Sequence, residues 1–271
     1  MNASCRNDPL IGIVENPTKP GAVQLRALLM QKLGARKLPC RFFADAAGVA
    51  ACGEAIRCLI VIGGDGSILR FADVASARDI PLLGVNVGRI GFLAELTAAD
   101  LDRALARLQS GDYTVEQRMM LRCSINDDAP FHCLNDILVF KRSFSGVAQI
   151  TVTVDNECAG TVFCDGMIAA TPTGSTGYSL SAGGPVIAPG MEAIALTPVC
   201  SHTLYMRPIV TSADAVIRFS VEDGGVVAAD GMRRREVGTG DCISVTRSER
   251  RARFIRVNET GLFGLIREKL S

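Results

Sequence analysis

The pattern of hydrophobic and polar residues changes near residue 112. Before that point, short apolar runs alternate with stretches of helical periodicity. The apolar runs predict buried strands at 10–14, 41–44, 59–62 and 80–85. Helical periodicity predicts a helix from Pro20-Gly21 to Gly34, whose covered face carries Leu25, Leu28, Leu29 and Leu33. A second helix follows Thr97, which resembles a capping box with Asp100, and ends at Gly111. Alternating strands and helices predict a Rossmann-like parallel α/β domain over residues 1–112.

From Tyr113 onward, helical periodicity nearly disappears. Apolar runs separated by turns such as Asp155-Asn156 predict strands at 119–125, 132–140, 147–154, 160–171, 193–199, 215–221, 226–229, 242–246 and 252–257. We interpret Arg233 to Arg235 and Arg250-Arg251 as solvated turns, with a phosphate-facing role as the alternative. The pattern predicts a β-sandwich domain over 113–257, and a tail, 258–271, that returns to the first domain.

Composition narrows the class of protein. The 271 residues are 48% hydrophobic and 21% charged, with a net charge of +1, which argues against a broad nucleic-acid surface. No apolar run approaches the ~20 residues that span a bilayer, and residues 1–9 lack the apolar core of a signal peptide. None of the ten cysteines forms a C-x-x-C pair, so we expect reduced thiols and a cytoplasmic protein.

The main candidate for chemistry is the loop Gly63-Gly64-Asp65-Gly66, between a predicted strand and a predicted helix. Glycines let a phosphate approach backbone N–H groups, and a helix N-terminus adds partial positive charge. A carboxylate is unfavourable in such a cradle unless it takes a proton from a hydroxyl that attacks phosphorus. The alternative is a tight turn with Asp65 as helix N-cap. The loop is neither a Walker loop nor the dinucleotide fingerprint, since Leu69 stands where the third glycine belongs.

Three further stretches are candidates for binding. The glycine-rich segment 84–93 is either a binding loop, with Arg89 toward phosphate and Phe92 toward a flat ring, or a loop pinned in the core. Asn135-Asp136 interrupts an apolar strand, and is either a pair for ligand hydroxyls or a β-bulge. The third stretch, 165–185, concentrates small hydroxyl residues and glycines around Tyr178, which favours a binding site with a short helix at 175–181.

Together these stretches resemble the NAD kinase family, in the family's order and over nearly the whole chain. The matching segments are Gly63-Gly64-Asp65-Gly66, Asn86 to Leu93, Asn135-Asp136, and Asp165-Gly166 running into Thr171-Pro172-Thr173-Gly174-Ser175-Thr176-Gly177-Tyr178-Ser179. The Gly-Gly-Asp-Gly sequence alone is shared with lipid kinases and phosphofructokinases. The run from Thr171 is far more specific to NAD kinases.

The resemblance implies transfer of the γ-phosphoryl group of ATP to the 2′-hydroxyl of the adenosine ribose of NAD, with Mg²⁺ or another divalent cation on the triphosphate. It implies that Asp65 orients or deprotonates the hydroxyl, that Phe92 lies beside adenine, and that Asn135 and Asp136 bind ribose hydroxyls. It also implies a homodimer or homotetramer. The residues implied to bind nucleotide are Gly63, Gly64, Gly66, Arg70, Phe92, Asn135, Asp136, Asp165, Thr173, Thr176, Gly177, Tyr178 and Ser181.

The sequence departs from the family pattern at Asp136, where Glu is commoner, at Phe163-Cys164, where many relatives carry Arg and a small polar residue, and at Met232, where Gln is common. These departures leave the choice between NAD and NADH open. Two other hypotheses remain: a lipid kinase that shares only the central loop, and a non-catalytic dinucleotide sensor, which would need no carboxylate at position 65.

Overall fold

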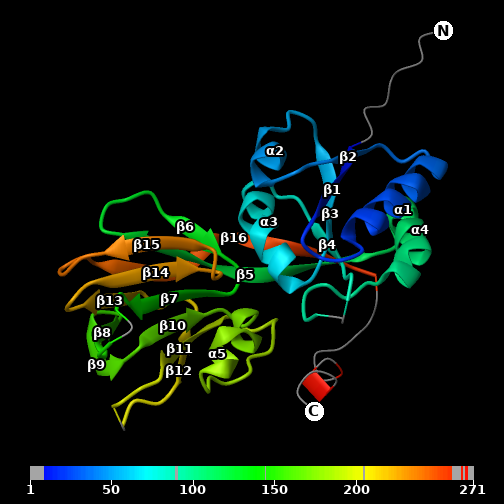
Figure 1. The fold of residues 1–271 in the computed structure, drawn as a ribbon. Helices are drawn as coiled ribbons and strands as arrows, with labels where there is room; N and C mark the ends of the chain where they lie inside the picture. The colour runs from blue at the N-terminus through cyan, green and yellow to red at the C-terminus, as the bar shows by residue number, and fades with distance from the viewer. Residues whose placement is uncertain are drawn as a thin grey trace. The chain divides into compact units, whose positions relative to one another are not determined.

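The chain divides into two units, each with its own hydrophobic core (Figure 1). The computed structural model describes residues 9–88, 91–143, 145–203, 205–257, 264, 266 and 267. The first unit comprises Met1–Gln117 and Ala252–Ser271, and the second comprises Arg118–Arg251. Residues 252–257 therefore group with the first unit, whereas the sequence placed them with the β-rich part. The predicted tail, 258–271, lies almost wholly outside the described residues.

The first unit is built on a parallel sheet with the strand order β2-β1-β3-β4. Its strands are β1 (Leu10–Glu15), β2 (Cys40–Phe42), β3 (Ile56–Ile62) and β4 (Leu82–Val85). The end of β16 (Ile243–Arg256) adds a further parallel strand beside β4, with Phe254 opposite Leu82. Near-continuous branched apolar sequence suits these strands because helices cover both faces of the sheet.

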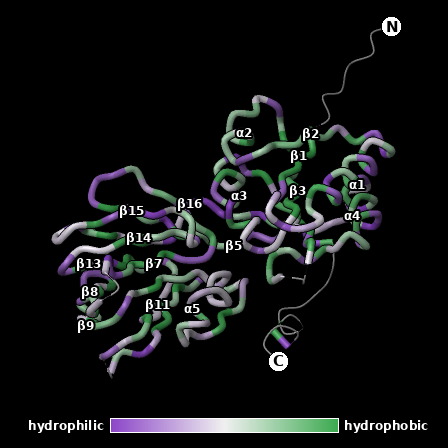
Figure 2. Tube along the Cα trace, in the orientation of Figure 1, coloured by the Kyte–Doolittle hydropathy of each residue, from purple (hydrophilic) through white to green (hydrophobic). Residues whose placement is uncertain are grey.

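The helices of this unit are α1 (Ala22–Ala35), α2 (Ala46–Ala51), α3 (Asp65–Ala77) and α4 (Leu101–Ser110). Cys58, Ile60 and Ile62 of β3 pack with α1 and α4, and α3 covers the opposite face (Figure 1). In Figure 2, α1 and α4 mix hydrophilic and hydrophobic colour, as expected for helices with one covered face. No described helix combines the length and apolar character needed to cross a membrane.

Two expectations for these helices have different outcomes. The capping box of Thr97 and Asp100 is present and heads the short 3-10 turn η1 (Ala98–Asp100), which leads into α4. The assignment of Leu28 to the covered face of α1 is wrong. The buried positions of α1 are Ala22, Leu25, Leu29 and Leu33, whereas Leu28 is 38% exposed.

The second unit is the predicted β-sandwich, with two sheets around one core. One sheet has the order β12-β11-β10-β7-β14-β15, and the other contains β16, β13, β8 and β9, with β5 and β6 beside them. Its strands are β5 (Thr114–Ile125), β6 (Phe131–Cys133), β7 (Asp136–Lys141), β8 (Ala148–Val154), β9 (Glu157–Cys164), β10 (Gly166–Ala170), β11 (Ala193–Val199), β12 (Ile209–Ser212), β13 (Ile217–Val221), β14 (Gly225–Ala229) and β15 (Arg233–Val237).

The central strand β10 is buried on both faces. Met167 and Ala169 belong to the core between the sheets, and Ile168 and Ala170 belong to a second cluster with Ile187 on the outer face. That outer face carries the turn η2 (Gly174–Thr176) and the short helix α5 (Tyr178–Ser181), in agreement with the helix predicted at 175–181. The glycine- and hydroxyl-rich stretch is thereby held against a rigid sheet.

The interpretation of the arginine clusters as turns is wrong. Arg233 to Arg235 begin β15, which pairs with β14, and Arg250-Arg251 lie inside the single long strand β16. β15 is an edge strand, where charged side chains are tolerated because one side of the strand faces solvent. The confirmed fold class is a parallel α/β unit and a β-sandwich.

Candidate functional site

Asp65 is the first residue of α3, and only Gly63 and Gly64 separate it from the end of β3. Its Oδ2 accepts a hydrogen bond from the backbone N–H of Phe92 at 2.8 Å, and its Oδ1 accepts from Leu93 and Ala94 at 3.0 and 3.1 Å. The N-cap of α3 is Gly64, and no side chain caps the helix, so the N-cap alternative for Asp65 is wrong. A carboxylate offers about four lone-pair positions, so one position on Oδ2 remains available to a ligand.

Gly91 makes this arrangement possible. A Cβ atom at residue 91 would lie 1.9 Å from Oδ1 of Asp65 and 2.5 Å from its carboxyl carbon. No side chain fits there, because real Cβ contacts do not come closer than about 3 Å. Because Gly91 has no side chain, the Asp65 carboxylate can lie close to the backbone of residues 91–94.

A cavity of about 540 Å³ opens beside Asp65. Its lining includes Gly63, Gly64 and Gly91 together with Lys19 and Asn86. The cavity therefore combines bare backbone, the start of a 13-residue helix and a lysine side chain. Each of these favours an anion, and the volume suits a small-molecule ligand.

The other predicted residues of the first unit lie around this loop without all lining the cavity. Gly66 is exposed in the first turn of α3, and Arg70 is exposed further along the same helix. Phe92 contributes its backbone N–H to Asp65 while its side chain is half-buried. Arg89, the expected phosphate contact of this loop, lies outside the described residues.

A metal centre made of protein ligands alone is not found in the described part of the chain. No three His, Cys, Asp or Glu side chains gather there in a group that could hold a metal ion. Asp65 is the one carboxylate among the described residues that line the cavity. Mg²⁺ is commonly held by one or two carboxylates together with substrate phosphates, and the cavity fits that kind of binding.

In the second unit, Asp230 forms a similar set of bonds. It lies in the turn between β14 and β15 at a positive φ of 50°. Its Oδ2 accepts from the backbone N–H of Leu134 at 3.0 Å, and its Oδ1 accepts from Asn135 and Asp136 at 2.7 and 3.4 Å. These bonds fix the bend that separates β6 from β7, so Asn135-Asp136 is a held bend at the start of a buried strand.

Side-chain oxygens of both residues in this bend lack a hydrogen-bond partner among the described residues. Oδ1 of Asn135 is buried without a hydrogen-bond partner among the described residues. Asp136 is 6% exposed, and no described residue hydrogen-bonds its carboxylate. Burial, with a smaller contribution from the charge of Asp230, raises the pKa of Asp136 to about 7. Near neutral pH this carboxyl group can therefore either accept or donate a hydrogen bond, which suits a ligand hydroxyl.

The run from Thr171 to Ser181 holds itself against the bend through its own hydroxyls. The Thr171 hydroxyl donates to the carbonyl of Leu134 at 2.6 Å, and Ser175 donates to Pro172 at 2.6 Å. A Cβ atom at Gly174 would lie 2.1 Å from the carbonyl oxygen of Asn135, so only glycine permits this contact. Gly177 lies next to the same bend, 3.4 Å from Nδ2 of Asn135 by the same measure.

The remaining predicted residues of the run divide into bonded and exposed side chains. Thr173 is buried and its hydroxyl accepts from Arg118 at 3.3 Å. The Thr176 hydroxyl donates to the carbonyl of Thr173 at 3.2 Å. Tyr178 and Ser181 are exposed on α5. Several hydroxyls that the sequence offered to a ligand are thus used to build the turn itself.

Asp165 stands between β9 and β10 and forms an ion pair with Lys141. Its Oδ1 lies 2.6 Å from Nζ of Lys141, and both side chains are partly buried. The pair ties the end of β7 to the start of β10, at the end of these strands away from the Asn135-Asp136 bend.

Sequence reasoning missed the partners that hold the site. Lys19 and Asn86 line the cavity, Asp230 fixes the bend, and Lys141 neutralises Asp165. A signal existed for Asp230, since Asp230-Gly231 is a turn sequence directly after an apolar run. Its three partners lie about 95 residues away in the sequence, which no local pattern reveals.

Comparison with known proteins identifies both units. The model of the ATP-NAD kinase N-terminal domain matches residues 14–113, and that of the ATP-NAD kinase C-terminal domain matches residues 134–257. The NAD kinase of Moorella thermoacetica is 37% identical over 275 residues, covering 96% of this chain and 88% of its own. An NAD kinase from Archaeoglobus fulgidus, solved in complex with ATP, aligns with a TM-score of 0.81 at 27% identity, over 95% of this chain and 98% of its own.

A more distant structure supports the fold alone. Yeast NADH kinase, complexed with NADH, aligns with a TM-score of 0.85 at 22% identity, covering 97% of this chain and 87% of its own. The two-unit architecture is thus shared with kinases of known structure.

Proposed function

Since the chain belongs to the ATP-NAD kinase family, we propose that it transfers the γ-phosphoryl group of ATP to the 2′-hydroxyl of the adenosine ribose of NAD, giving NADP. The resemblance in the sequence to this family is confirmed by both domain matches. The observation that carries the residue-level proposal is the position of Asp65, a carboxylate with one lone-pair position left, beside a cavity suited to phosphates.

Asp65 acts as the proton acceptor for the attacking hydroxyl. Three backbone N–H groups fix the orientation of its carboxylate, so no reorganisation is needed when the hydroxyl approaches. Lys19, the glycine backbone and the start of α3 hold the phosphates of the donor. A divalent cation bound through these phosphates would neutralise their negative charge.

The second unit recognises NAD. Asn135 and Asp136 take the ribose hydroxyls, because their carbonyl and carboxyl oxygens have no protein partner in the described chain. Gly177, Tyr178 and Ser181 lie on the turn and helix beside that bend and line the rest of the dinucleotide site. Asp165 with Lys141 stands at its far end.

The test is an assay of the purified protein with ATP, Mg²⁺ and either NAD or NADH, read out by an NADP-specific dehydrogenase. We expect NADP from wild type and almost none from Asp65→Asn. Dinucleotide binding without turnover in both proteins would instead identify a sensor. Turnover restricted to lipid acceptors would identify a lipid kinase.

A homo-oligomer is the proposed assembly, either a dimer or a tetramer. The support comes from the edge strand β12, where Ile209 and Val210 are 39% and 48% exposed, and from Met191, which is 53% exposed. An exposed apolar edge strand is a template for pairing with another chain. Ile209→Lys with Val210→Lys should reduce the mass measured by light scattering to that of a monomer. An unchanged mass would exclude β12 as the interface.

The proposed compartment is the cytoplasm. All nine cysteines in the described chain are free, and free thiols persist where the surroundings are reducing. Cell fractionation with an antibody to the chain tests this.

A further inference from the structure

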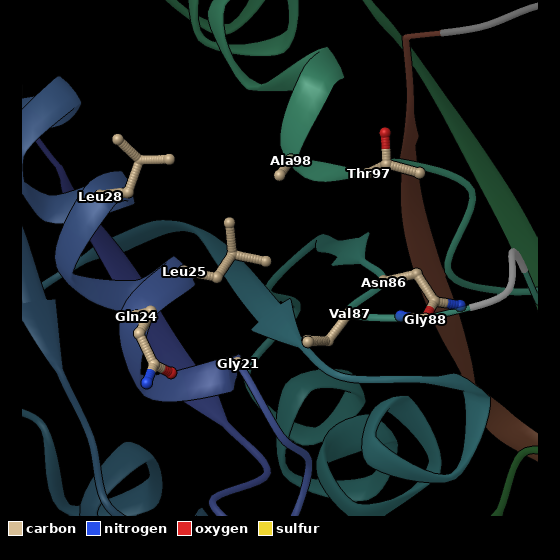
Figure 3. A pocket seen from close by; sticks show the side chains of 9 residues that line it. All are labelled: Gly21, Gln24, Leu25, Leu28, Asn86, Val87, Gly88, Thr97 and Ala98. Carbon is tan, nitrogen blue, oxygen red and sulfur yellow. The ribbon is translucent and has the colours of Figure 1, made fainter.

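A second cavity, of about 420 Å³ (Figure 3), shares lining residues with the Asp65 cavity. Its walls come from the first two turns of α1, the turn after β4 and the start of η1. Asn86, Val87 and Gly88 line both cavities. A ligand with phosphates beside Asp65 can therefore continue past this turn into the second cavity.

The shared turn is firmly held. The backbone N–H of Asn86 donates to the carbonyl of Leu96 at 2.6 Å, and Oδ1 of Asn86 accepts from the N–H of Gly88 at 2.8 Å. On the η1 side, the N–H and the hydroxyl of Thr97 both donate to Asp100 at 2.9 Å. Two walls of the cavity are thus fixed by hydrogen bonds before any ligand binds, which reduces the entropy lost on binding.

The chemistry of the walls fits a flat, uncharged ring. Leu25, Leu28, Val87 and Ala98 supply apolar surface, and Figure 3 shows Leu25 and Val87 on facing elements. No Asp, Glu, Lys or Arg is among the described residues that line the cavity. The side chain of Gln24 lies on the side nearest Gly21, and no described residue hydrogen-bonds its amide.

The exposure of Leu28 also has an explanation in this cavity. The residue has the periodicity of a core position, yet it is 38% exposed, beside Leu25 and opposite the turn after β4. A single exposed leucine is ordinary, but one that extends an apolar wall next to a phosphate cavity favours a ligand that covers it.

We propose that this cavity binds the purine ring of the phosphoryl donor. The ring packs against Leu28, Val87 and Ala98, and the Gln24 amide pairs with its edge. An amide offers one donor and one acceptor together, which is the pattern that glutamine uses on the N6 and N7 atoms of adenine. The assignment rests on the proposed function, since it needs a nucleoside triphosphate whose phosphates occupy the Asp65 cavity.

Leu28→Asp tests the apolar wall, and Met30→Asp is its matched control. Both residues lie on α1 and are 38% exposed, but only Leu28 lines the cavity. Calorimetry at saturating NAD measures two dissociation constants for each protein. One is for an ATP analogue with an uncleavable β–γ bridge, and the other is for inorganic tripolyphosphate, which has no base.

Leu28→Asp should raise the dissociation constant of the ATP analogue about tenfold and leave that of tripolyphosphate within twofold of wild type. Met30→Asp should change neither dissociation constant. An unchanged affinity of Leu28→Asp for the analogue overturns the proposal, as does equal weakening of both ligands. Binding does not depend on turnover, so these results stand apart from the NADP assay. Wild-type protein that binds the analogue without making NADP would count against the proposed function and not against this subsite.

Gln24→Leu tests recognition of the base edge. We expect the ratio of affinities for the adenosine and guanosine analogues to fall about fivefold, because leucine keeps the apolar volume and loses both hydrogen-bonding groups. A ratio equal to that of wild type would overturn the role of Gln24.

Discussion

The two units use the same hydrogen-bonding device for different purposes. In the first unit, Asp65 accepts hydrogen bonds from three consecutive backbone N–H groups, those of residues 92–94. In the second unit, Asp230 accepts hydrogen bonds from the backbone N–H groups of residues 134–136. Asp65 lines an open cavity, whereas Asp230 holds the bend, where burial, with a smaller contribution from the charge of Asp230, raises the pKa of Asp136. A carboxylate held by backbone donors is therefore not in itself catalytic. Its role depends on what its last lone pair can reach.

The largest expected effect separates these two aspartates. Asp65→Asn replaces one oxygen by an NH₂ group that faces backbone donors, and it removes the proposed proton acceptor. NADP formation should fall about 10²- to 10⁴-fold. Asp230→Asn loses the same kind of bonds, about 1–3 kcal/mol of stability, without touching the proton acceptor. Its kcat should stay within about tenfold of wild type, measured beside its thermal unfolding. Equal losses of kcat would show that both residues act only through the backbone.

Gly91→Ala fills the space that the Asp65 carboxylate occupies, without altering the carboxylate itself. The new methyl group would lie 1.9 Å from Oδ1, so the loop must move and stability should fall by about 1–3 kcal/mol. We expect kcat to fall about 10- to 100-fold. Gly53→Ala is the control, because nothing lies within 4 Å of a Cβ atom there. Urea unfolding and the NADP assay give the two readouts, and a fully active Gly91→Ala would contradict the proposed geometry.

Titration of Asp136 makes the stability of the second unit depend on pH. Its folded pKa, about 7, is above the unfolded value, so the folded state holds a proton that the unfolded state has lost between pH 4 and 7. The stability contributed by this group is fully present below pH 4 and is lost as the pH rises through 7. Relative to Asp136→Asn, the ligand-free wild type should lose roughly 3–4 kcal/mol of unfolding free energy over this window, since one pKa unit corresponds to about 1.4 kcal/mol. Denaturant titrations at several pH values measure the difference, and parallel curves would refute it.

The smallest effect concerns the ion pair of Lys141 with Asp165. Lys141→Met leaves a partly buried carboxylate without its cation, and we expect the KM for NAD to rise about threefold with little change in kcat. Arg142→Met is the control, because this neighbouring cation pairs with Glu236 instead. An effect as large in the control would assign the change to general charge rather than to Asp165.

Much of the fold could be predicted because hydrophobic periodicity reports burial directly. The strands 59–62 and 193–199 and the capping box at Thr97 are clear in the sequence. The prediction failed at β15, where the arginines pair with β14 through their backbone, and in the middle of β16, where Arg251 forms an ion pair with Glu192. It also failed at Leu28, because periodicity cannot distinguish a core face from the wall of a cavity.

The site was predictable in its types of residue and not in its partners. The glycines and Asp65 stood out because such a loop is chemically unusual. The bonds from residues 92–94 to Asp65 and from residues 134–136 to Asp230 join positions about 27 and 95 residues apart. Such pairs depend on how strands and loops meet in space. The local sequence therefore identified Asp65 as a candidate but could not predict the orientation of its carboxylate.

The last strand also determines when the first unit can be completed during synthesis. Phe254 lies opposite Leu82, Ile255 and Val257 fill the core beneath α1 and α4, and Arg256 forms ion pairs with Glu95 and Glu116. A nascent chain that has emerged from the ribosome only to residue 117 has β4 as an uncovered edge. The sheet and core of the first unit can therefore be completed only after residues 252–257 have emerged, when the whole of the second unit has already been synthesised.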